Sequence, residues 1–73
     1  MRQYAKLVFH EGQWYFRIDG VKGSTRSWAD RDAALAELAR QGWKIDRPYP
    51  KGLSVTLKSR LGILGYLLVR SVQ

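Results

Sequence analysis

The chain has 73 residues, no cysteine, and thirteen lysines and arginines against six aspartates and glutamates, for a net charge of +7 at pH 7. Its length allows one small domain, and the lack of cysteine excludes a disulfide framework and favours a reducing, cytoplasmic compartment. The longest apolar stretch, Leu61 to Val69, is about half of what a membrane-spanning helix needs. The first residues do not resemble a signal peptide.

The positive charge is concentrated in the last third of the chain. Asp46 is the last acidic residue, and residues 47–73 carry five basic side chains. Such a balance favours an anionic partner, and we expect a protein or nucleic acid rather than a membrane. The alternative is that the charge only keeps a small apolar protein in solution.

Alternating side chains predict an antiparallel hairpin at the start of the chain. In the segments 4–9 and 14–19 every second residue is apolar, which is the period of a half-buried strand. Glu11 and Gly12 supply a tight turn between them. A short third strand is expected from Thr25 to Trp28. The side chains expected to point inward are Ala5, Leu7, Phe9, Trp14, Phe16 and Ile18.

A helix is expected to follow, running through Gln41. Asp30 can cap its start, and Gly42 suits the left-handed position beyond its end. The segment is rich in alanine and has no β-branched residue. Ala34, Leu35, Leu38 and Ala39 share one face, so the helix should lie across the sheet.

After the helix, residues 43–45 are expected to form another strand. Pro48 and Pro50 should prevent regular pairing at 48–50 and end a ββ(β)αβ unit there. Residues 53–58 alternate like a strand, and 62–72 fit a buried final strand. The sequence therefore predicts an α+β domain, an antiparallel sheet with one helix packed across it. Residues 1–50 form the ββ(β)αβ unit, and 51–73 form a basic, apolar extension of the same domain, either a strand pair or a mobile tail.

Catalysis is not expected. His10 is the only histidine and should lie on the surface at a strand end, without a neighbour in sequence that would make it a general base. The carboxylates have turn and helix-start roles. One histidine without cysteine does not build an ordinary transition-metal site, so we expect no metal and no cofactor.

Cations and aromatic side chains are mixed on the predicted hairpin and third strand. Arg17, Lys22, Arg26 and Trp28, with Tyr15 nearby, match the side chains by which small domains contact DNA or RNA. The same residues also fit ordinary solvated positions. This pattern makes a small basic nucleic-acid-binding domain the alternative interpretation.

The leading interpretation comes from a resemblance. A strand pair, then "WADRDAALAELA", then "GWKIDRPYP" is similar to the core of small phage-encoded inhibitors of bacterial RNA polymerase, over residues 14–50. The resemblance implies a non-enzymatic regulator of transcription that docks on RNA polymerase in the host cytoplasm. Arg47 falls where that family has a basic residue that contacts the polymerase. Tyr49 replaces a second basic residue, and the acidic strip of the family is missing.

With the basic extension, the docking site that this resemblance implies consists of Arg47, Tyr49, Lys51, Lys58 and Arg60. "ELARQGW" also resembles a widespread uncharacterised bacterial family in which a helix ends in "GW" before a strand. That second resemblance implies a structure and no function.

Overall fold

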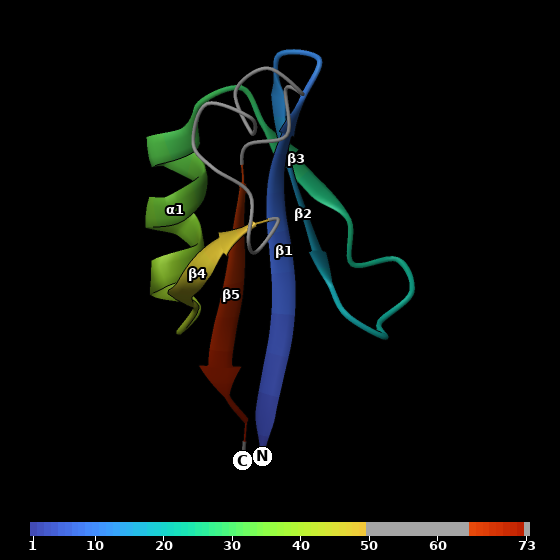
Figure 1. Cartoon of the computed structure of the whole chain (residues 1–73), viewed down its shortest axis with the longest axis vertical. Helices are drawn as coiled ribbons and strands as arrows, with labels where there is room; N and C mark the ends of the chain where they lie inside the picture. The colour runs from blue at the N-terminus through green and yellow to red at the C-terminus, as the bar shows by residue number, and fades with distance from the viewer. Residues whose placement is uncertain (50–64, 73) are drawn as a thin grey trace.

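The computed structural model describes residues 1–49 and 65–72. The elements in these ranges are β1 (Arg2–His10), β2 (Gln13–Ile18), β3 (Arg26–Trp28), α1 (Arg31–Arg40), β4 (Lys44–Tyr49) and β5 (Gly65–Ser71). The strands form one antiparallel sheet in the order β3-β2-β1-β5-β4, and α1 lies on one side of it (Figure 1). The expected α+β architecture is confirmed.

The expected hairpin is formed by β1 and β2. Leu7 lies opposite Phe16, and both are fully buried. The turn consists of Glu11 and Gly12, which have φ angles of 49° and 81°. Positive φ at both turn residues is the geometry that matches the twist of two paired strands. β3 then pairs with β2, placing Trp28 opposite Trp14.

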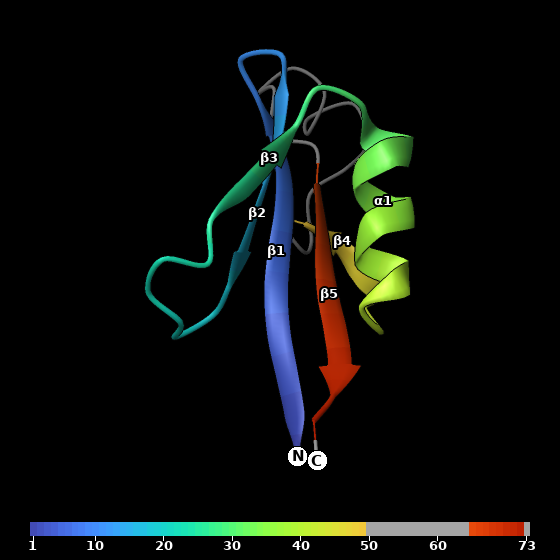
Figure 2. The same cartoon turned by 180° about the vertical axis from the view of Figure 1, so that it is seen from behind.

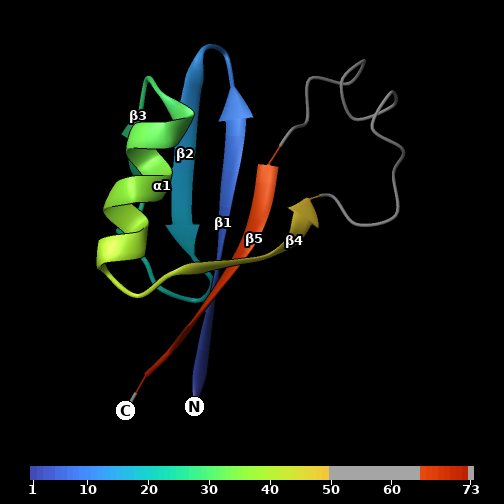
Figure 3. The ribbon, with the colours of Figure 1, turned by 90° about the vertical axis from the view of Figure 1, so that its left-hand side faces the viewer.

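The start and end of α1 agree with the sequence. Asp30 is the N-cap, and its carboxylate accepts a 2.8 Å hydrogen bond from the Ala33 backbone N–H. Gly42 follows the C-cap with a φ of 89°, a left-handed conformation that favours glycine. α1 lies over β2 and β3 (Figure 3). Ala34 and Leu38 are on the side of the helix that faces the sheet, and both are buried.

The hydrophobic core fills the space between α1 and the sheet. Trp43 is 4% exposed, and its ring meets that of Phe16 edge-on at a centroid distance of 5.4 Å. Trp14 is half-buried and packs against the core from its rim. The buried core residues are Ala5, Leu7, Phe16, Ala34, Leu38, Trp43 and Leu68.

The last strand, β5, lies inside the sheet between β1 and β4 (Figure 2). Our expectation that pairing stops before Pro48 is wrong, because β4 continues through Pro48, opposite Tyr66, to Tyr49. Among the described strands β4 lies at the edge of the sheet, so none of them needs a hydrogen bond from the N–H that Pro48 lacks. The register shifts between Ile45 and Arg47, which leaves Asp46 in a bulge. The strand expected at 53–58 lies outside the described residues.

Candidate functional site

The sheet has a second face, on the side away from α1, which we call the open face. Residues directly opposite each other in an antiparallel sheet point to the same side, and successive residues alternate. Since Ala5 and Leu7 point towards α1, Tyr4 and Lys6 point away from it. By the same alternation the open face includes Arg2, Tyr4, Lys6, Val8, Tyr15, Arg17, Ser27, Lys44, Arg47, Leu67, Val69 and Ser71. No helix within the described ranges covers them (Figure 1).

Cations form a row across the middle of the open face. Arg17 lies opposite Lys6, Lys6 lies opposite Leu67, and Leu67 lies opposite Arg47. Neighbouring strands are about 4.8 Å apart, so the backbone positions of this row span about 14 Å from β2 to β4. Three strands thus contribute positive charge to one line that crosses the strand direction.

Two tyrosines flank this row. Tyr15 lies opposite Val8 on one side of it, and Tyr4 lies opposite Val69 on the other. Their exposed fractions are 37% for Tyr15 and 46% for Tyr4. Tyr4 and Val8 are four positions apart in β1, so the two tyrosines are separated by about 13 Å along the strands. The face therefore has one exposed tyrosine on each side of the cation row.

The cations differ in whether another side chain of the protein binds them. Arg31, Arg40 and Arg47 pair with carboxylates, and Arg70 donates to the side-chain oxygen of Gln3 over 2.8 Å. A different group has no ion pair and no side-chain hydrogen bond with another described residue: Arg2, Arg17, Lys22 and Lys44. Arg17 and Lys44 belong to the open face, so the charges of these two residues are available to a ligand.

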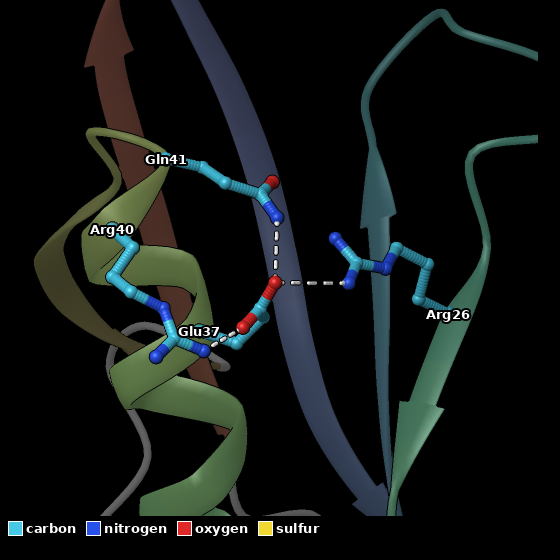
Figure 4. A network of polar contacts seen from close by, with 4 residues as sticks. All are labelled: Arg26, Glu37, Arg40 and Gln41. Atoms are coloured by element: carbon cyan, nitrogen blue, oxygen red, sulfur yellow. Dashed lines mark hydrogen bonds and ion pairs between the residues drawn. The ribbon is translucent and has the colours of Figure 1, made fainter.

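Arg26 has a structural partner on the opposite side of the sheet. Its guanidinium lies 3.6 Å from Glu37 Oε1 (Figure 4). The same group covers the Trp28 ring, 4.9 Å from the ring centroid. Arg40 donates a hydrogen bond to the same carboxylate, and Gln41 Nε2 does so over 3.3 Å. The hydrogen bond and the charge of Arg40 lower the pKa of the Glu37 carboxyl, and the charge of Arg26 adds to this. Arg26 thus links β3 to α1.

The four residues predicted from the hairpin and third strand do not form one surface. Arg17 lies on the open face, and Lys22 lies in the loop between β2 and β3. Arg26 and Trp28 lie opposite Phe16 and Trp14, on the helix side. Sequence reasoning missed Tyr4 and Lys6, although both were already the outward positions of the first predicted strand.

The docking residues implied by the resemblance are only partly described. Arg47 lies on the open face, and its Nε donates a 2.9 Å hydrogen bond to Asp46 Oδ2. Tyr49 pairs with Gly65 in the sheet, and its side chain lies outside the described part. Lys51, Lys58 and Arg60 also lie outside the described residues.

Two hollows occur around β4. An apolar hollow of about 340 Å³ lies between α1 and β4 and is lined by side chains that include Leu35, Leu38 and Ile45. The second, of about 580 Å³, adjoins the open face, and we call it the polar hollow. Its lining includes Arg2, Gly42, Lys44, Asp46, Arg70 and Ser71.

Within residues 1–49 and 65–72, no group of three or more histidines or carboxylates is placed to hold a metal ion. No helix in the same part of the chain is long and apolar enough to cross a membrane. His10 is exposed at the end of β1, with its Nε2 3.6 Å from Glu11 Oε1.

Comparison with protein families, curated proteins and solved structures finds no match for this chain. The resemblance to phage-encoded inhibitors of RNA polymerase therefore stays a prediction.

Proposed function

We propose that this protein is a non-enzymatic, cytoplasmic binding protein that holds single-stranded nucleic acid on the open face. The observation that carries the proposal is the row of Arg17, Lys6 and Arg47 between Tyr4 and Tyr15. Cations bind the phosphates of a strand, and exposed aromatic rings stack on its bases. The open face provides both at spacings fixed by the sheet.

The tyrosines favour a single strand over a duplex. In a duplex the flat faces of the bases are stacked on one another, whereas an unpaired base can lie on an aromatic side chain. Between the two tyrosines, Leu67, Val8 and Val69 give the face an apolar floor, and all three are half-buried. Such a surface accepts many bases, because each base has a face that can stack. We therefore expect weak sequence preference.

The proposal is tested by the affinity for a labelled oligonucleotide of mixed sequence, measured by fluorescence anisotropy. Stacking of one base contributes about 1–3 kcal/mol, so Tyr15→Ala should weaken binding about 5- to 150-fold. Tyr15→Phe keeps the ring and serves as the matched control, with affinity close to that of the original chain. Equal affinities for Tyr15→Ala and the original chain, or tighter binding of the matching duplex, would contradict the proposal.

Docking on bacterial RNA polymerase is the second candidate. It is favoured by the position of Arg47 in the cation row, because a cationic face also complements an acidic protein surface. The two candidates are separated by affinity capture from a bacterial lysate with and without nuclease. Polymerase subunits that are retained after nuclease treatment, and lost with Arg47→Gln, would support docking. Retention that nuclease abolishes would support nucleic-acid binding.

A further inference from the structure

The polar hollow lies beside the row that contains Tyr4. Lys44 and Tyr4 are both opposite Val69, from β4 and β1 respectively, so the three residues form one row of the open face. Arg2 lies two positions before Tyr4, opposite Ser71. The backbone positions of Tyr4 and Lys44 are two strand spacings apart, about 10 Å. A nucleic-acid strand whose base stacks on Tyr4 can therefore place its next phosphate group in the hollow.

We infer that the polar hollow binds a phosphate monoester, as found at the phosphorylated end of a nucleic-acid strand. That the ligand is a nucleic acid rests on the proposed function. That the bound group is a phosphate monoester rests on the charges of the hollow. A phosphate monoester carries a charge of about −1.5 to −2 at pH 7, more than the single charge of a phosphate inside a strand. A site with two available cations therefore favours the end of a strand over its interior.

The two available cations are Arg2 and Lys44, which approach the hollow from opposite sides of β5. Neither forms an ion pair or a side-chain hydrogen bond with another described residue. Ser71 lies opposite Arg2 and adds a hydroxyl group to the lining. Guanidinium, ammonium and hydroxyl groups are all donors that a phosphate oxygen accepts.

The remaining charged groups of the hollow are already engaged. Arg70 covers the ring of Trp43 at 4.5 Å and donates to Gln3 Oε1 and, over 3.3 Å, to the Gln41 carbonyl oxygen. Asp46 is the carboxylate in the lining, and it accepts the hydrogen bond from Arg47 Nε. Arg2, Lys44 and Arg70 outnumber this single carboxylate, so the hollow keeps a net positive charge.

The test compares three oligonucleotides of one sequence, with hydroxyl groups at both ends, with a 5′-phosphate, or with a 3′-phosphate. We expect one phosphorylated form to bind about three- to tenfold more tightly than the hydroxyl form. Arg2→Gln and Lys44→Gln should each reduce this preference about two- to fivefold, the effect of one exposed charge pair. Asp46→Asn should increase it. Lys22→Gln removes an equally unpaired cation outside the hollow and should leave the preference unchanged.

Inorganic phosphate separates this inference from the proposed function. Titrated into labelled protein, it should shift the backbone amide signals of Gly42 and Ser71 and leave those of Gly20 and Lys22 in place. If these shifts occur while the hydroxyl-ended strand fails to bind, the proposed function is wrong and the hollow still binds phosphate. If the amide signals shift but the three oligonucleotides bind equally well, the hollow binds free phosphate, and its role at the ends of nucleic-acid strands is overturned. Equal affinities without such shifts would overturn the inference entirely.

Discussion

Replacing Arg17 by glutamine should reduce the salt dependence of binding by a calculable amount. Each phosphate neutralised on a single strand contributes about 0.7 to the slope of log K against log salt concentration. With Arg2 and Lys44 added to the row of Arg17, Lys6 and Arg47, five contacts give a slope of about −3.5. Affinity should then fall about 130-fold between 50 and 200 mM salt, and about 50-fold in Arg17→Gln.

The matched control is Arg26→Gln, which removes the same charge from the opposite face. Arg26 contacts Glu37 and Trp28, so its loss should leave the slope at its original value. The assay is anisotropy with one labelled oligonucleotide at four or more salt concentrations, with circular dichroism as a check that both variants are folded. Equal slopes for Arg17→Gln and the original chain, or equal reductions in both variants, would refute the assignment of the ligand to the open face.

Three further predictions concern the scaffold, and each is measured as the free energy of unfolding in urea. A Cβ at Gly65 would lie 2.5 Å from the Leu7 carbonyl oxygen and 2.9 Å from Val8 Cγ1, so Gly65→Ala should cost about 1–3 kcal/mol; an unchanged midpoint would argue against this close approach. Leu38→Ala should cost about 2–5 kcal/mol because it opens a cavity beneath α1, and a cost below 1 kcal/mol would mean that the site collapses. Asp30→Ala should cost about 1 kcal/mol and Asp30→Ser much less, whereas equal losses would contradict the capping role.

The parts of the fold that depend on local pattern were predictable. Asp30 and Gly42 mark the ends of α1 because a cap and a left-handed residue act within one turn of the chain. Alternation also gave the inward and outward sides of β1 and β2, and with them Tyr15 and Arg17. These signals need only neighbours within a few residues, so one sequence contains them.

The rest of the site depends on long-range pairing. β3 has only the three residues Arg26–Trp28, too few to show by alternation which side faces α1; its pairing with Phe16 decides this. Lys44 is placed on the open face by its pairing with Val69 of β5. The continuation of β4 through Pro48 likewise depends on its place at the sheet edge. None of these neighbours is close in sequence.

The place of β5 between β1 and β4 also determines when the sheet can be completed during synthesis. β5 leaves the ribosome after the other described strands. Until then β1 and β4 lack the strand that pairs with both of them, and the core lacks Leu68. A nascent chain that stalls before Gly65 displays unpaired strand edges next to apolar side chains, which promotes aggregation. Only chains translated beyond β5 can therefore form the complete five-stranded sheet and, with it, the complete open face.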